Sequence, residues 1–149
     1  MKKVLITGSS GLVGSAAVEF FYKKKFQIFA LDNDLRGQIF GKNYSTNKIK
    51  KYQKEKYSNV VFLNQNIANI NEIKKTFKNN KFDLIIHAAG QPSHDWSAKN
   101  PLLDFNVNAV GTLNLLELTR KNSPKAIFIF TSTNKVYGNL DAAKVKLNK

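Results

Sequence analysis

Thr7-Gly8-Ser9-Ser10-Gly11-Leu12-Val13-Gly14 is the stretch that decides the fold of this chain. It follows a short apolar run and opens a segment in which apolar residues recur at helical spacing. Between a strand and a helix, Gly8 allows a sharp turn, Gly11 lets the backbone approach a pyrophosphate, and Gly14 lets the helix pack closely on the strand. We therefore expect backbone N–H groups near Leu12 and Val13, helped by the helix dipole, to bind phosphates.

An acidic residue supports this interpretation. Asp32 ends the second apolar run, 18 residues beyond Gly14, where a carboxylate can accept hydrogen bonds from an adenosine ribose. A carboxylate there favours a free 2′-hydroxyl over a 2′-phosphate, hence NAD over NADP, although Arg36 lies close enough to weaken the preference. The alternative is a simple glycine turn with a solvated loop acid. Dinucleotide binding is favoured because strand, turn, helix and acid all occur in the required order.

Short apolar runs alternate with helical patterns along the chain. Strand runs that are almost continuously apolar are typical of parallel strands covered on both faces. This alternation predicts an α/β fold, a doubly wound parallel sheet of the Rossmann type with strand order 3-2-1-4-5. The ligand crevice is then expected at the carboxyl ends of the first and fourth strands. The predicted strands are residues 4–7, 26–31, 60–63, 82–87 and 126–131.

The fourth long helix is predicted to begin at Asn100-Pro101, a cap followed by proline, and to run to about Arg120. Its residues are apolar on nearly every side, so we expect the helix to be buried on two of its sides. The sheet covers one side, and a partner subunit is expected on the other, making a homodimer through this helix. The residues between Asn33 and Ser58 are polar and carry the least clear structural signal.

Composition limits the other possibilities. At 149 residues the chain is expected to be one domain. Its net charge of +14 comes almost entirely from lysine, with Arg36 and Arg120 as the two arginines, so no nucleic-acid partner is expected. Cysteine is absent, which fits a cytoplasmic protein without disulfides or thiolate metal sites. No apolar stretch approaches the ~20 residues of a membrane helix.

The glycine turn is spaced as in the short-chain dehydrogenase/reductase superfamily, and four further segments resemble its extended, NAD-dependent nucleotide-sugar epimerases and dehydratases. Of the four segments given next, the third resembles the family's segment after strand five. The fourth resembles, more narrowly, the CDP-paratose (CDP-tyvelose) 2-epimerase subgroup. The segments are His87-Ala88-Ala89-Gly90-Gln91; Asn108 with Gly111-Thr112-Leu113-Asn114-Leu115-Leu116-Glu117; Thr131-Ser132-Thr133-Asn134-Lys135-Val136-Tyr137-Gly138; and Asp32-Asn33-Asp34-Leu35-Arg36 with Phe40-Gly41, Ser45-Thr46 and Gln91-Pro92-Ser93-His94-Asp95-Trp96.

The resemblance implies a role for each matching residue. Asn66, with Ile67, stands where the family usually has an aspartate that contacts the adenine amino group. Thr133 matches the hydroxyl residue that binds the oxidised sugar oxygen, the alternative being a strand-end threonine bonded locally. The remaining implied contacts are Gly8, Gly11, Leu12, Val13 and Gly14 to the pyrophosphate, Asp32 and Asn33 to the adenosine ribose, Ala88, Ala89, Gln91 and Asn108 to the nicotinamide ribose, and Thr131 to the nicotinamide ring.

One motif of the family, its catalytic pair, is not found at its expected place in this sequence. The family's catalytic Tyr-x-x-x-Lys pair opens the helix after strand five, and the sequence reaches Lys149 without it there. We therefore expect residues 1–149 to form a truncated NAD(P)-binding Rossmann domain, incomplete on its C-terminal side and nearly silent as an epimerase. In the complete family, NAD oxidises the sugar transiently while the tyrosinate takes the proton. The alternative is an inert NAD-binding module that senses the cofactor or pairs with a partner.

Overall fold

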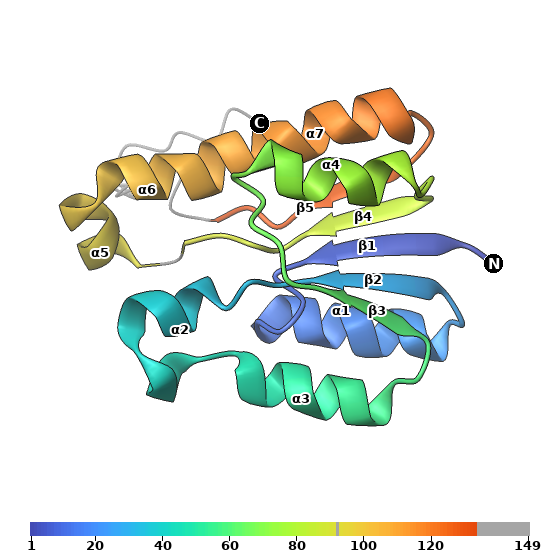
Figure 1. Cartoon of the computed structure of the whole chain (residues 1–149), viewed down its shortest axis with the longest axis horizontal. Helices are drawn as coiled ribbons and strands as arrows, with labels where there is room; N and C mark the ends of the chain where they lie inside the picture. Colours follow the sequence, from blue (N-terminus) through green and yellow to red (C-terminus); the bar gives the residue numbers. More distant parts are fainter. Residues whose placement is uncertain (92, 134–149) are drawn as a thin grey trace, which may run out of the picture.

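The computed structural model describes residues 1–91 and 93–133, which form a five-stranded parallel sheet with helices on both faces (Figure 1). The strand order is β3-β2-β1-β4-β5, which confirms the predicted doubly wound order. All four strand pairings are parallel, and each predicted strand is present to within two residues of its expected bounds. The strands are β1 (Lys3–Thr7), β2 (Gln27–Leu31), β3 (Val60–Leu63), β4 (Leu84–His87) and β5 (Ile127–Phe130).

Helices occupy every connection between the strands. None of the helices in the described ranges is long and apolar enough to cross a membrane. They are α1 (Leu12–Lys23), α2 (Leu35–Phe40), the 3₁₀ turn η1 (Lys42–Tyr44), α3 (Asn47–Lys56), α4 (Ile70–Lys78), α5 (His94–Lys99), α6 (Pro101–Phe105), the π turn η2 (Asn106–Val110) and α7 (Gly111–Asn122).

The sheet separates two apolar clusters, because successive strand residues point to opposite faces. In β1, Leu5 joins the cluster beneath α4 and α7, whereas Val4 and Ile6 join the one beneath α1 and α3. All three side chains are fully buried. Burial on both faces explains why the central strands are continuously apolar.

The polar region after β2 folds into α2, η1 and α3, which the sequence pattern did not predict. Asp34 organises it from a left-handed conformation, φ 56°, and its carboxylate accepts hydrogen bonds from Gly37 N, Ser45 Oγ and Thr46 N. Partial burial raises the pKa of Asp34, but these hydrogen bonds outweigh it, and the pKa lies below its usual value. A single carboxylate therefore holds the whole connection together.

The long helix expected from Asn100 onward is correctly placed but is not regular. Asn100 caps it and Pro101 is its first residue, as predicted. It is interrupted by η2, where Gly111 N donates to Asn106 O in the i→i−5 pattern of a π turn. One side, including Leu115, is buried on the sheet, and the other is open to solvent in this chain. The expected burial of the exposed side by a partner subunit therefore stays a prediction.

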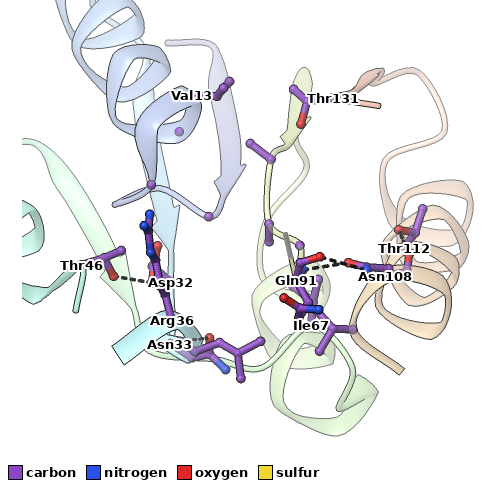
Figure 2. Close-up of a pocket in the computed structure, with 18 of the residues that line it drawn as sticks. Val13, Asp32, Asn33, Arg36, Thr46, Ile67, Gln91, Asn108, Thr112 and Thr131 are labelled. Carbon is purple, nitrogen blue, oxygen red and sulfur yellow. Dashed lines mark hydrogen bonds between the residues drawn. The ribbon is translucent and has the colours of Figure 1, made fainter. Parts of the chain in front are cut away.

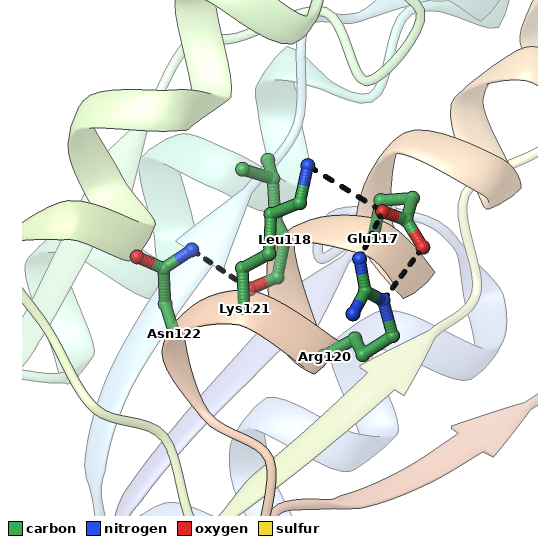
Figure 3. Close-up of polar contacts among 5 residues, drawn as sticks. All are labelled: Glu117, Leu118, Arg120, Lys121 and Asn122. Atoms are coloured by element: carbon green, nitrogen blue, oxygen red, sulfur yellow. Dashed lines mark hydrogen bonds and ion pairs between the residues drawn. The ribbon is translucent and has the colours of Figure 1, made fainter.

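The last turns of α7 carry a small charged cluster (Figure 3). The Arg120 guanidinium binds both oxygens of Glu117 at 3.0 Å, and Lys121 Nζ lies 3.5 Å from the same carboxylate. The hydrogen bond from Arg120, with the positive charges nearby, lowers the pKa of Glu117. The cations also suit the carbonyl end of the helix, although exposed pairs of this kind stabilise a protein only weakly.

Replacement of Gly14 by alanine should destabilise the protein. A Cβ there would lie 2.6 Å from Gly8 C and 2.8 Å from Ser9 Cα, and these backbone atoms cannot rotate away. We expect Gly14→Ala to lower the free energy of unfolding by about 3 kcal/mol in urea denaturation. Ser15→Ala, next to it on α1, is the control and should cost no more than about 0.5 kcal/mol. Equal stability of the two variants would show that α1 is not packed this closely.

Candidate dinucleotide-binding cleft

A cavity of about 710 Å³ opens at the carboxyl ends of the strands, where the strand order reverses between β1 and β4 (Figure 2). This is the place predicted for a ligand crevice in a doubly wound sheet. All fifteen candidate residues of the sequence analysis line it. They are Gly8, Gly11, Leu12, Val13, Gly14, Asp32, Asn33, Asn66, Ile67, Ala88, Ala89, Gln91, Asn108, Thr131 and Thr133.

The glycine turn forms one wall of this cleft. Gly8 has φ 66°, a conformation that side chains disfavour, and a Cβ there would lie 2.7 Å from the Ala88 carbonyl oxygen. The turn therefore touches the loop after β4 directly. The first hydrogen bond inside α1 runs from Ser15 N to Gly11 O, so the preceding N–H groups are left for a ligand. Leu12 and Val13 stand at this end of the helix with exposed side chains.

Asp32 joins the glycine turn to the loop after β2. Its Oδ2 accepts a hydrogen bond from Ser10 N at 2.9 Å, and its Oδ1 accepts one from Asp34 N at 2.9 Å. The side chain is almost fully buried, but Oδ2 has a further lone pair for a ribose hydroxyl. Arg36 lines the same part of the cleft and makes no ion pair with the described residues (Figure 2).

Helix α3 and its first turn support this wall from behind, through Lys50 and Gln53, which the sequence analysis missed, and through Thr46, which it named only in the family resemblance. Lys50 Nζ donates to Asp32 O at 3.0 Å, and the buried Gln53 Nε2 donates to Ser9 O at 3.0 Å. Thr46 Oγ1 also reaches Asp32 Oδ1, at 3.3 Å. The three side chains lie on one face of the helix, since their positions are four and three residues apart. That spacing within a basic run was the signal that could have found them.

A directed chain of hydrogen bonds crosses the floor of the cleft at His87. Thr112 Oγ1 donates to Asn108 O at 2.6 Å, which uses its proton, so it accepts from His87 Nε2–H at 2.9 Å. His87 Nδ1 is then the acceptor of Thr7 Oγ1–H at 2.8 Å, and Thr7 Oγ1 accepts from Ala89 N. His87 is neutral in this arrangement. Burial lowers its pKa to about 4.

Gln91 and Asn108 bind each other on one wall of the cleft rather than standing free (Figure 2). Gln91 N donates to Asn108 Oδ1 at 2.8 Å, and the Nδ2 of Asn108 donates to Gln91 O at 3.3 Å. Asp104 Oδ1 accepts from both side chains. The pair therefore fastens the loop after β4 to the π turn η2. This fits the frequent occurrence of π turns at functional sites.

The remaining expected residues lie at the two ends of the cleft. Ile67 is buried against Gly111. A Cβ added at Gly111 would lie 2.7 Å from Cγ1 of Ile67. Thr131 donates from both N and Oγ1 to His87 O, so its hydroxyl is used to hold β5 to β4. Thr133 lines the cavity beyond it. Residues 134–138 of the expected segment after β5, and Pro92 of the segment after β4, lie outside the described residues.

A Tyr-x-x-x-Lys spacing does occur on α3, at Tyr52 and Lys56, and there Lys56 Nζ donates to Tyr52 Oη at 2.6 Å. This pair is exposed and lines neither described cavity. The hydrogen bond to Tyr52 raises the pKa of Lys56. No tyrosine is among the described residues that line the cleft.

The sheet and cleft define a doubly wound nucleotide-binding domain, and comparison with known proteins narrows this class. A family model described as GDP-mannose 4,6 dehydratase matches residues 5–148, so the chain belongs to this family. CDP-paratose 2-epimerase of Salmonella typhi is 32% identical over 142 residues, which are 95% of this chain and 40% of that protein. A UDP-glucose 4-epimerase of Pisum sativum is 30% identical, over 92% of this chain and 38% of its own length.

Solved structures show the same arrangement. The UDP-Glc/GlcNAc 4-epimerase of Campylobacter jejuni superposes with a TM-score of 0.76 at 30% identity, covering 93% of this chain and 39% of that one. UDP-glucose 4-epimerase of Bifidobacterium longum, in complex with NAD+ and UDP, has the same fold with a TM-score of 0.75 at 23% identity, covering 92% and 38%. The chain thus spans about 40% of the length of the curated relatives it matches.

The buried His87 predicts a loss of stability in acid. Its pKa is about 4 in the folded protein and about 6.5 in the unfolded chain, which therefore takes up the proton first. The free energy of unfolding should be unaffected by His87 above pH 6.5 and should fall as the pH drops toward 4. The loss from this group is about 3.5 kcal/mol at most, given ~1.4 kcal/mol per pKa unit.

Urea denaturation between pH 4 and pH 7.5, with His87→Gln for comparison, measures this contribution. Glutamine can both donate and accept a hydrogen bond but does not titrate. The wild-type protein should therefore lose more stability than the variant between pH 6.5 and pH 4. Parallel pH profiles would mean that His87 has the same pKa in the folded protein as in the unfolded chain.

Proposed function

We propose that this chain is the NAD-binding part of a nucleotide-sugar epimerase. One observation carries the proposal: a single cleft at the reversal of strand order collects the glycine turn, Asp32 and the loop after β4. Membership of the GDP-mannose 4,6 dehydratase family and the similarity to several epimerases support it. Because the chain spans about 40% of those relatives, the conversion of a sugar is proposed for the protein of full family length.

The described residues fit a dinucleotide. Gly8 and Gly14 let the turn pack directly on neighbouring backbone, where a Cβ would collide, and so hold the N-terminus of α1 at the cleft. The N-terminal N–H groups of α1 supply donors for a pyrophosphate, which suits an anion at the positive end of a helix. Asp32 Oδ1 is taken up by Asp34 and Thr46, and the lone pair of Oδ2 that remains after its bond to Ser10 is the acceptor for a ribose hydroxyl.

The other expected contacts follow the cleft in the same order. We assign Asn33 to the adenosine ribose beside Asp32, and Asn66 with Ile67 to the adenine end. We assign the nicotinamide half to the residues after β4 and β5, where Thr133 holds the sugar oxygen. When bound, NAD supplies a hydride acceptor for transient oxidation of the sugar. The residues assigned to the nicotinamide half are Ala88, Ala89, Gln91, Asn108 and Thr131.

The neutral His87 has a positioning role in this proposal. Its two ring nitrogens connect Thr7, below the glycine turn, with Thr112 on α7. Ala89 N is joined to the same chain through Thr7 Oγ1, at 3.3 Å. The pyrophosphate wall and the nicotinamide wall of the cleft are thereby held at a constant separation, without a charge beneath the cofactor.

NAD should bind through the glycine turn, and Gly11→Asp should abolish the binding. A carboxylate at position 11 repels a pyrophosphate, and its Cβ would already lie 3.2 Å from Gly8 O. We expect the dissociation constant of NAD to rise at least about a hundredfold, measured by calorimetric titration. Because Gly11→Asp changes packing as well as charge, Leu12→Asp, at an 89% exposed side chain, serves as a second variant.

The preference for NAD over NADP provides the control for the titration of the glycine-turn variants. Asp32 should make the wild type bind NAD more tightly than NADP, because a 2′-phosphate would approach a carboxylate. Asp32→Asn should narrow that difference while leaving pyrophosphate binding in place. Equal NAD affinity of the wild type and Gly11→Asp would contradict the assignment of the turn. A wild-type preference for NADP would show that Arg36 decides the choice.

A second copy of the chain is the partner we propose for the open side of the α6–α7 helix. Leu102 is 81% exposed there, Phe105 62% and Leu113 59%, which is unusual for a row of large apolar side chains on a free surface. A helix with apolar residues on two sides is expected to be covered on both. A self-complementary contact around a twofold axis satisfies this with one surface.

Sedimentation of the wild type and Leu113→Lys tests the proposed dimer. A lysine in the centre of a packed helix pair is expensive to bury, so the dimer dissociation constant should rise about a hundredfold or more. Ile49→Lys is the matched control, because Ile49 is exposed on α3, on the opposite face of the sheet. A monomeric wild type at ~100 μM, or a dimer that Leu113→Lys leaves intact, would exclude this contact.

A further inference from the structure

The glycine turn contains a β-turn, residues 8–11, which leads from β1 into α1. The hydrogen bond from Gly11 N to Gly8 O, at 2.9 Å, closes it and leaves Ser9 and Ser10 in the middle. This hydrogen bond is compatible with more than one orientation of the central peptide, because β-turns of types I and II share it and differ in that peptide. Closure of the turn therefore does not by itself fix the peptide group that joins Ser9 to Ser10.

Two side chains hold this central peptide group from opposite ends. The Ser9 carbonyl accepts a hydrogen bond from Gln53 Nε2 at 3.0 Å, and the N–H of Ser10 donates to Asp32 Oδ2 at 2.9 Å. A trans peptide is planar, with its C=O and N–H pointing in opposite directions, so these two bonds leave it little rotation. The hydroxyl groups of both serines are buried and make no hydrogen bond with the described residues, so they do not hold the turn.

The orientation of this peptide affects both groups that we assign to the cofactor. On one side its N–H binds Asp32 Oδ2, the oxygen proposed to accept a ribose hydroxyl. On the other side the chain continues through Gly11 to the N–H groups at the start of α1, which are proposed to bind the pyrophosphate. A rotated peptide would withdraw its N–H from the carboxylate and redirect the backbone that follows. The binding groups are therefore in place only while the peptide is held.

Gln53 contributes little to stability by this contact. Its side chain is 2% exposed, and its Oε1 is buried without a hydrogen bond from the described residues. The amide cannot be turned over to correct this, because Ser9 O needs a donor. A buried acceptor that is left unsatisfied costs about as much as one hydrogen bond contributes, so the two effects nearly cancel. Stability alone therefore gives no reason for a glutamine at this position rather than an apolar residue.

We propose that Gln53 is a positioning residue for the cofactor, which holds the central peptide of the glycine turn in the orientation that binds a dinucleotide. This inference rests on the proposed dinucleotide binding. It makes α3 part of the cofactor site, although no residue of this helix lines the cleft. Loss of the Gln53 amide should then weaken the binding of NAD without a matching loss of stability.

Calorimetric titration and thermal melting of Gln53→Met test this separation. Methionine has an unbranched side chain of the same length but cannot donate a hydrogen bond to Ser9 O. The dissociation constant of NAD should rise about tenfold, while the melting temperature of the free protein should stay within about 4 °C of the wild type. ADP-ribose, which contains the pyrophosphate and the adenosine ribose but no nicotinamide, should lose affinity by the same factor.

Ser123→Ala is the matched control. Ser123 is also buried, and its Oγ accepts a hydrogen bond from the N–H of Phe82, at 2.9 Å, so it too holds a distant backbone group. It lies outside both cavities, near the amino end of β4. The variant should melt at least about 4 °C below the wild type, because a buried N–H loses its acceptor, and should bind NAD within about twofold of the wild type.

The outcomes separate this inference from the proposed function. A wild type that binds neither NAD nor ADP-ribose overturns the proposed function itself. A folded Gln53→Met that binds NAD within about twofold of the wild type overturns only the role of Gln53. So does a loss of NAD affinity that Ser123→Ala shares, because Gln53 would then act through stability alone. Gln53→Ala, which removes the amide without overpacking, decides the question should Gln53→Met not fold.

Discussion

At Gly14 the first turn of α1 lies against the carbonyl group of Gly8, closer than any side chain would permit. This contact sets the position of the helix relative to β1, and so the direction in which its N-terminal N–H groups point. Gly8 in turn touches the backbone of Ala88, which brings the loop after β4 beside the turn. The two walls of the cleft are therefore placed by backbone packed on backbone. Such contacts leave little freedom for adjustment.

Much of this arrangement follows from short-range patterns. The apolar runs predict the strands because parallel strands are covered on both faces, and the order 3-2-1-4-5 then brings Gly8, Asp32 and Asn108 to one edge. The glycine turn and Asp32 could be predicted for the same reason, whereas Asn108, which lies in η2, was predicted only from the resemblance to the family. The strand order fixes where each strand ends in such a sheet, and this position does not depend on the conformation of the helices around it.

The missed features depend on contacts between distant residues. Gln53 and Lys50 belong to a polar, basic run whose sequence pattern predicts no definite element, and Gln53 is the buried residue of α3. Their role appears only once the helix is packed, when Gln53 reaches Ser9, 44 residues away. The tautomer of His87 likewise depends on Thr112, whose proton is already committed to Asn108 O. Local propensity carries no information about such pairings.

The π turn η2 lowers the local stability of its helix but shapes one wall of the cleft. A π turn is an α-helix that contains one additional residue, and its hydrogen bonds are poorer than those of the regular helix. Loss of one residue between Asn106 and Val110 would give a better-bonded helix. The segments before and after it would keep nearly the same rotation, because the five residues of a π turn take up about the same angle as four residues of an α-helix. The bulge itself would be lost, and with it the position of Asn108, which binds Gln91 in the loop after β4. The additional residue thus weakens the bonding of the helix but lets it project Asn108 toward that loop.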